Sequence, residues 1–249
     1  MHKKTILLFL LITSIFSCKN ELKDADIIVR KSIEVSGGDI ISSSTIDFDF
    51  RDKHYKANRD AGLYKFERVF SVPNGNIKDI LSNNGFKRFF NDEQRIIQDS
   101  MIPKYSASVN SVHYFSVLPY GLEGKAVNKS LLGKSKVKGE AYYKIKVTFN
   151  EDGGGEDFED VFIYWINTET FKADYLAYSY EENHGLGLRF REAYNERYIK
   201  GIRFVDYNNY KPKGDNAVLE TLDMQFENGK LELLSKIELE NVLVSIGTK

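Results

Sequence analysis

Cys18, the only cysteine of the chain, follows a pattern that directs covalent attachment of lipid to a thiol. Lys3 and Lys4 give a basic start, and an apolar run over residues 6–16 leads to the small residue Ser17. This run is far shorter than the roughly 20 apolar residues that a membrane-spanning helix needs, so it is typical of an export signal. The spacing predicts cleavage before Cys18 and lipidation of its thiol. An ordinary secretory signal that ends near a cysteine by coincidence is the alternative.

The stretch Ile15-Phe16-Ser17-Cys18 resembles the lipobox of bacterial lipoproteins, and it divides the chain into three parts. Residues 1–17 are predicted as the signal peptide, 18–21 as the lipidated cysteine and a short tether, and 22–249 as a single domain. Acyl chains contribute about 0.8 kcal/mol per buried methylene group, so three chains would hold the domain at a membrane. We therefore expect a protein of the bacterial cell envelope, anchored to the outer membrane by its N-terminal lipid. The sequence leaves open whether it lies on the periplasmic or the surface face of that membrane.

Composition indicates a globular domain without a disulfide. Hydrophobic residues make up 42% and aromatic residues 13% of the 249 residues, enough for a sizeable core, and 29% are charged. With Cys18 lipidated, no thiol is left for a disulfide or a cysteine nucleophile. The net charge is −1, and it becomes −3 once Lys3 and Lys4 leave with the signal peptide. Nucleic acid is therefore not an expected partner, because binding it requires a basic surface.

The histidines of the mature chain do not form a metal motif. They are His54, His113 and His184, and no two of them are close in the sequence. A zinc site normally takes three or four nitrogen or sulfur ligands, often with one closely spaced pair, so we expect no metal and no other cofactor. The Gly-x-Ser-x-Gly motif of serine hydrolases is also missing from the sequence. We expect no enzyme activity.

Two charged clusters allow a functional and a structural interpretation. An acidic cluster surrounds three glycines; its members are Glu151, Asp152, Glu156, Asp157, Glu159 and Asp160. Calcium can use such carboxylates, but the spacing of an EF-hand is missing, and a solvated hairpin loop is the favoured interpretation. A basic cluster consists of Arg189, Arg191, Arg197 and Arg203. It could bind a phosphate or carboxylate headgroup through forked hydrogen bonds, although cross-strand pairing with Glu192 and Glu196 is favoured.

The elements that must position these residues are mostly strands. Apolar residues at a spacing of 3.6 predict a helix over 22–36, which Gly37-Gly38 ends. A period of two then begins, with Ile46 and Phe48 alternating with acidic residues. The predicted strands are 46–51, 64–70, 77–81, 86–90, 143–149, 161–166, 176–180, 186–194, 198–205, 218–226 and 234–244, with turns at 72–76 and 83–85. Two helices are expected mid-chain, from Pro103 to Ser116 and over 123–132.

This order predicts an α+β domain of mainly antiparallel β structure. Hairpin strands with one apolar face must pack on a second sheet or curl around something, and helices inserted mid-chain can cover the concave side. We expect a half-open β-barrel or strongly curved sheet, with the N-terminal helix and both mid-chain helices on its concave side. The order of elements over 22–249 resembles the lipoprotein-localisation fold of the LolA and LolB carriers. That resemblance implies a barrel that shelters acyl chains.

Four stretches resemble a family of uncharacterised Bacteroidota lipoproteins, for which the resemblance implies no activity and no site residues. They are residues 109–115, 118–122, 153–158 and 189–194.

Aromatic residues supply the candidate ligand site. The residues expected to line the concave face, or to form a lid above it, are Phe48, Phe50, Phe66, His113, Tyr114, Phe115, Trp165, Tyr178 and Phe190. Excluding water from an apolar cavity stabilises a bound chain by roughly 25 cal/mol per Å², and His113 or Tyr120 would meet a polar head. The same rings could instead fill the interior, with His113 hydrogen-bonded in the core, because bulky aromatics occupy space efficiently.

The sequence thus predicts an envelope lipoprotein that binds or transfers an apolar ligand, such as a lipid or a lipoprotein's acyl chains. The second interpretation is a structural or partner-binding lipoprotein with a filled core, which uses the acidic loop or a strand edge to bind an envelope protein. An envelope enzyme is the third.

Overall fold

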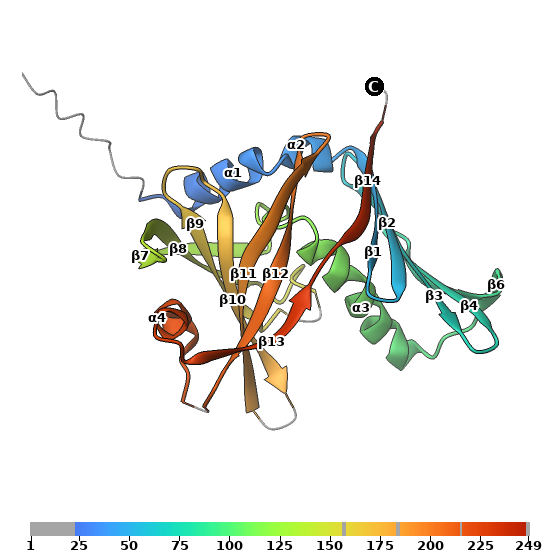
Figure 1. The fold of residues 1–249 in the computed structure, drawn as a ribbon. Helices are drawn as coiled ribbons and strands as arrows, with labels where there is room; N and C mark the ends of the chain where they lie inside the picture. Colours follow the sequence, from blue (N-terminus) through green and yellow to red (C-terminus); the bar gives the residue numbers. More distant parts are fainter. Residues whose placement is uncertain (1–22, 156–157, 183–184, 215, 248–249) are drawn as a thin grey trace, which may run out of the picture.

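Two seven-stranded antiparallel sheets make up most of the computed structural model, which describes residues 23–155, 158–182, 185–214 and 216–247 (Figure 1). Sheet A has the order β14-β1-β2-β3-β4-β5-β6. Its strands are β1 Ser44–Phe50, β2 Lys53–Asp60, β3 Leu63–Val72, β4 Gly75–Ser82, β5 Gly85–Phe90, β6 Glu93–Arg95 and β14 Glu240–Ile246. Sheet B has the order β13-β12-β11-β10-β9-β8-β7. Its strands are β7 Val127–Val137, β8 Glu140–Phe149, β9 Val161–Asn167, β10 Ala173–Glu182, β11 Gly185–Ile199, β12 Ile202–Pro212 and β13 Leu231–Ile237.

Four α-helices accompany the sheets in the described part of the chain. They are α1 Ala25–Val35, α2 Gly38–Ile41, α3 Ile102–Phe115 and α4 Leu222–Glu227, with 3-10 turns at Asp99–Met101 and Leu219–Thr221. The carboxylate of Asp24 accepts hydrogen bonds from the backbone N–H groups of Asp26 and Ile27 in the first turn of α1. This capping explains why the helix begins there. Gly37 ends it at φ +85°, and a Cβ at Gly37 would lie 2.4 Å from the carbonyl oxygen of Gly201.

The two faces of sheet B carry different apolar cores. The inner face packs against Ile28, Val29 and Ile33 of α1 and against the segment that follows α3, around Leu122. The outer face packs against α4 through Leu222. A third core joins α2, sheet A and the first residues of β12. Residues alternate between the two faces along each strand of sheet B, so neighbouring residues belong to different cores.

Helix α3 lies between sheet B and the β3–β5 part of sheet A (Figure 1). Arg68 of β3 donates to Ser108 of α3 at 2.7 Å, and Arg88 of β5 lies 3.7 Å from the ring centroid of Tyr105. At the other end of the helix, Phe115 packs against aromatic rings of sheet B. Helix α3 therefore connects the two sheets.

Most of the expected elements are present, and the mainly antiparallel architecture is confirmed. The expected barrel is wrong, because the strands form two sheets that neither close nor curl strongly. The second mid-chain helix is also wrong, since residues 127–132 belong to β7. The expected strand over 218–226 is a 3-10 turn followed by α4. Strand β2 was not predicted, and a turn at 200–201 divides the expected strand 198–205.

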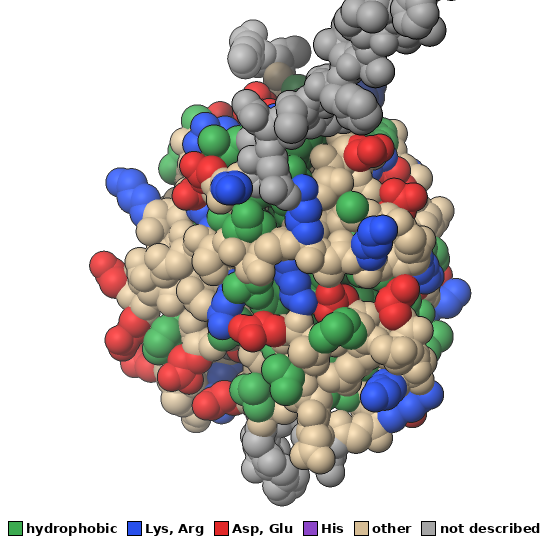
Figure 2. Space-filling model, turned by 90° about the vertical axis from the view of Figure 1, so that its left-hand side faces the viewer, with side chains coloured by type: hydrophobic (Ala, Val, Ile, Leu, Met, Phe, Trp, Pro, Cys, Tyr) green, Lys and Arg blue, Asp and Glu red, His purple; other side chains and the backbone are tan. Residues whose placement is uncertain are grey.

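The face that carries β7 and α4 has basic and acidic side chains interspersed over it, with hydrophobic side chains only in small groups (Figure 2). Among the described residues, no helix is both long enough and apolar enough to cross a bilayer.

Candidate functional site

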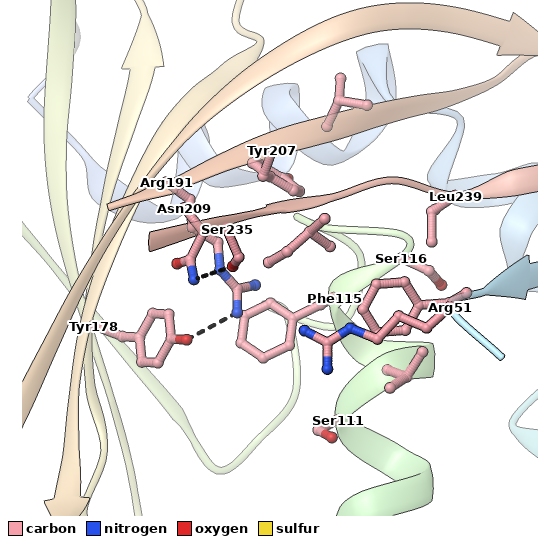
Figure 3. A pocket seen from close by; sticks show the side chains of 14 residues that line it. Arg51, Ser111, Phe115, Ser116, Tyr178, Arg191, Tyr207, Asn209, Ser235 and Leu239 are labelled. Atoms are coloured by element: carbon pink, nitrogen blue, oxygen red, sulfur yellow. Dashed lines mark hydrogen bonds between the residues drawn. The ribbon is translucent and has the colours of Figure 1, made fainter. Parts of the chain in front are cut away.

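A cavity of about 330 Å³ lies between α3 and the inner face of sheet B, next to the β1–β2 turn (Figure 3). Its lining residues are Phe50, Arg51, Ser111, Val112, Phe115, Ser116, Tyr178, Arg191, Val205, Tyr207, Asn209, Ser235, Ile237 and Leu239. This volume lies within the range of small-molecule binding sites, which are mostly apolar with a few polar groups. The cavity is therefore the candidate functional site.

Periodicity explains why these residues meet. Ser111, Val112, Phe115 and Ser116 are spaced so that they share one face of α3. On β12, residues 205, 207 and 209 alternate onto the inner face of sheet B.

The apolar part of the wall centres on Phe115. Its ring centroid lies 5.7 Å from that of Tyr178 and 6.2 Å from that of Phe162. Val112 of α3 and Ile237 of β13 extend the apolar surface on either side. This part of the wall can cover an alkyl chain and exclude water from it.

A polar row crosses the same wall. Arg191, Asn209 and Ser235 are successive cross-strand partners on β11, β12 and β13. Arg191 Nη2 donates to the Tyr178 hydroxyl at 2.8 Å, and Asn209 Nδ2 donates to Ser235 Oγ at 3.1 Å (Figure 3). The Arg191 guanidinium also lies 4.1 Å from the ring centroid of Phe115. The cavity thus combines an apolar surface with one buried cation.

The structure does not bring the nine predicted ligand-site residues together. Phe50, Phe115 and Tyr178 line the cavity. Trp165 and Phe190 pack on the outer face of sheet B beneath α4, so their expected place on the common concave face is wrong. Cys18 and His184 lie outside the described residues.

The other predicted residues pack beside the cavity. Phe48 and Phe66 lie on sheet A, with ring centroids 5.8 Å and 4.6 Å from that of His113. Tyr114 of α3 turns its buried hydroxyl away from water, and burial raises its pKa to about 12. None of these residues lines the cavity, so the packed-core interpretation fits them better than the lid interpretation.

Several lining residues were not predicted. Five of them alternate along two strands: Val205, Tyr207 and Asn209 on β12, and Ser235 and Ile237 on β13. The period of two could have shown that the residues of each strand share one face. Arg51 could not be found by alternation, because it lies in a turn, where its φ is 56°. For these residues, alternation was the available signal, but no local feature marks the face that borders a cavity.

The basic cluster divides in the structure. Arg197 pairs with Asp206 at 3.1 Å, and Arg203 pairs with Glu196 and Asp174. The favoured interpretation, pairing with acids, therefore holds for these two arginines. Arg191 forms no ion pair with any described carboxylate. The described residues also contain no group of three or more His, Cys, Asp or Glu that could hold a metal ion.

Comparison with known proteins gives a family and a fold. The model of a family of unknown function, DUF6503, matches residues 3–239. The chain belongs to the DUF6503 family. No curated protein gives a significant match to this DUF6503 chain. The expectation of an uncharacterised family is thereby confirmed, and the Bacteroidota source stays a prediction.

Among solved structures, a DUF1329 family protein from Desulfovibrio piger is similar to this DUF6503 chain, with a TM-score of 0.53 and 13% identity. The alignment covers 92% of this chain and 96% of that protein, and it shows a shared fold alone. A LolA superfamily protein from Nitrosomonas europaea aligns with a TM-score of 0.49 and 11% identity, covering 92% and 96%.

His113 is a neutral core residue in this fold. Its side chain is fully buried, and Nε2 lies 3.1 Å from the backbone oxygen of Glu67. Because a carbonyl oxygen can only accept, Nε2 carries the proton. Nδ1 has no hydrogen-bond partner in the described part of the chain. Burial lowers the pKa of His113 to about 3, so the imidazole stays neutral in the native state at any pH above that value.

We expect this buried imidazole to make the free energy of unfolding depend on pH. Between about pH 6.5 and pH 3 the unfolded chain binds a proton at His113 that the native state does not. Stability therefore falls as pH falls, by up to about 1.4 kcal/mol per pH unit from this residue. Urea denaturation at pH 7 and pH 5 measures the change. His113→Gln keeps an N–H donor but cannot titrate, and it should lose less stability over this interval. Equal losses in both proteins would contradict the assignment.

Proposed function

We propose that this protein is a lipid-anchored protein of the bacterial envelope, at the outer membrane, that binds the apolar chain of a ligand in the cavity beside α3. The ligand is a lipid or the acyl chain of another lipoprotein, and the protein holds or transfers it without a chemical step. The observation that carries the proposal is the cavity of about 330 Å³ next to three of the predicted aromatic residues.

The physical basis is the removal of apolar surface from water. Each Å² of apolar ligand surface that the wall covers contributes about 25 cal/mol. Val112, Phe115 and Ile237 supply that wall from two different elements. The open volume supports a carrier over a scaffold with a filled core, because well-packed interiors hold few voids larger than a water molecule. Binding of an envelope protein partner stays a separate prediction.

Phe115→Asp is expected to weaken uptake of a neutral apolar probe about 10-fold or more. The substitution removes the central ring of the wall and places a charge where the chain would lie. The probe is N-phenyl-1-naphthylamine, whose fluorescence rises in apolar surroundings. It is titrated into the mature chain, residues 18–249, with Cys18→Ser so that no lipid is attached.

Leu243→Asp is the matched control, because Leu243 is 67% exposed on β14 and does not line the cavity. Its affinity for the probe should equal that of the unsubstituted chain. Circular dichroism of each variant checks that the fold is retained. Absence of saturable uptake by the unsubstituted chain would refute the proposed function.

A further inference from the structure

Arg191 is a buried cation whose hydrogen-bonding capacity is largely unused. The residue is 7% exposed and lies in the wall of the cavity. A guanidinium has five N–H groups, and the one hydrogen bond that Arg191 makes goes from Nη2 to Tyr178. Nε and Nη1 are buried and have no hydrogen-bond partner among the residues that the structure describes. Such a group costs free energy unless a partner satisfies it.

The neighbouring arginines show how this fold treats a buried guanidinium that serves structure alone. Arg203 is 4% exposed, and it donates to Glu196, Asp174 and the backbone oxygen of Ala173. Arg197 is likewise paired with Asp206. Arg191 lies in the same sheet and is buried about as deeply as Arg203. No described carboxylate pairs with it, however. The described residues thus leave Arg191 without an anionic partner, and the cavity beside it gives a ligand room to supply one.

The side chains around Arg191 hold it in position and add further polar groups to the cavity wall. The ring centroids of Phe115 and Tyr178 lie 4.1 Å and 4.9 Å from its guanidinium carbon, and these cation–π contacts hold the group in place. Asn209, its cross-strand partner, has an unpaired buried Oδ1, and its amide nitrogen uses one N–H on Ser235. A second N–H of that amide remains for a ligand. Nε and Nη1 lie on different edges of the guanidinium, so an oxygen atom of a ligand can accept from either one, and Asn209 Nδ2 is a further donor on the same wall.

We propose that Arg191 binds the anionic head of an amphiphile, a carboxylate or a phosphate ester, whose alkyl chain lies along the apolar wall. This inference rests on the proposed function, since it names the class of ligand that the same cavity takes. Charge-assisted hydrogen bonds to oxyanions are about twice as strong as neutral ones, and arginine suits both head types. Asn209 and Ser235 flank the head, and Val112, Phe115 and Ile237 cover the chain.

The test compares ligands that share one alkyl chain and differ in the head. Dodecanoate, dodecyl phosphate, dodecanol and dodecylammonium are titrated below their micellar concentrations into residues 18–249 with Cys18→Ser, by displacement of the neutral naphthylamine probe. Dodecanoate or dodecyl phosphate should bind about 10- to 100-fold more tightly than dodecanol, the factor expected for hydrogen bonds to a charged group. Dodecylammonium should bind most weakly. The tighter of the two anions identifies the head.

Two variants remove the anion preference by different routes. Arg191→Met deletes the charge and should reduce dodecanoate affinity to that of dodecanol. Asn209→Asp is nearly isosteric and gives Arg191 a cross-strand carboxylate, which should have the same effect without loss of the guanidinium. Lys236→Gln is the matched control, because Lys236 is an exposed cation of β13 that does not line the cavity, and it should change affinity less than about 3-fold.

The outcomes separate this inference from the proposed function. Equal affinity for dodecanoate and dodecanol, or an anion preference that survives in both Arg191→Met and Asn209→Asp, overturns the anionic head and leaves the apolar carrier standing. Failure of all four ligands and of the probe to bind refutes the carrier itself. Arg191→Met removes an unpaired buried charge, so its melting temperature should be at least that of the unsubstituted chain, and a lower one would show that the charge is structural.

Discussion

Replacing Asp79 with alanine is expected to lower the free energy of unfolding by about 3–5 kcal/mol, the cost of leaving a buried charge without its partner. Asp79 of β4 is fully buried between two guanidinium groups. Arg68 Nη2 donates to its Oδ2 at 2.6 Å, and Arg88 Nε donates to its Oδ1 at 2.6 Å. Hydrogen bonding to Asp79 also raises the pKa of Arg88. Without Asp79, two cations face each other beneath α3.

The same change should disturb the cavity, because the two arginines hold α3 on sheet A. Arg68 donates to Ser108, and Arg88 stacks on Tyr105. Urea denaturation followed by circular dichroism measures the stability, and uptake of the naphthylamine probe reports on the cavity. Glu232→Ala is the control, since the exposed pair of Glu232 with Lys211 contributes less than about 1 kcal/mol. A loss in Asp79→Ala no larger than in this control would show that α3 is held by its apolar contacts alone.

Replacing Trp165 with alanine is expected to cost about 3–5 kcal/mol of stability. The indole is fully buried on the outer face of sheet B, and its centroid lies 5.4 Å from that of Phe190. Its Nε1 donates to Ser135 Oγ at 3.0 Å and to Asp223 Oδ2 at 3.1 Å. The substitution opens a cavity under α4 and removes a donor from the buried carboxylate of Asp223.

Trp165→Phe separates packing from hydrogen bonding at this position. It keeps an aromatic ring but leaves Asp223 without the indole donor, and should cost about 1–3 kcal/mol. Trp165 is the only tryptophan, so circular dichroism rather than intrinsic fluorescence must follow the unfolding. Because α4 and the ligand cavity lie on opposite faces of sheet B, probe affinity of the folded Trp165→Phe protein should be unchanged. Reduced affinity in a folded variant would instead place Trp165 in the ligand site.

Hairpins with a clear alternation and a turn signal could be predicted from the sequence. Val72-Pro73-Asn74-Gly75 joins β3 to β4, with Val72 paired to Gly75, and Asn83-Asn84 joins β4 to β5. Helix α1 was predicted almost to its ends, because its apolar stripe and the following glycines are local features. In these segments the residues that decide the structure are neighbours in the chain.

Two segments were misassigned because their patterns fit a helix and a strand equally well. In 218–226 apolar residues recur at 218, 222, 224 and 226, which suits an exposed strand, but Leu222 and Phe226 are one helical turn apart and both pack on the outer core. In β7, Gly133 falls at a register shift after Leu131, and this shift interrupts the alternation. Tertiary packing decides between the two periods in such short segments.

The candidate site was predicted only in part for the same reason. Alternation says which residues of one strand share a face, but pairing sets which faces of different strands coincide. Tyr178 pairs with Phe162 on the inner face, whereas Trp165 pairs with Tyr175 on the outer face. The predicted set therefore mixed two sides of sheet B.

Local periodicity and turn chemistry were enough to establish a mainly antiparallel domain, its first helix and the helix that became α3. The division into two sheets, the cavity beside α3 and the position of Arg191 away from every described carboxylate were decided by contacts between residues far apart in the chain. The pairing of Ser44 with Ile246 and of Arg191 with Asn209 illustrates this. Such contacts depend on the register of whole strands, and a shift by one residue would exchange the buried and exposed side chains of each strand.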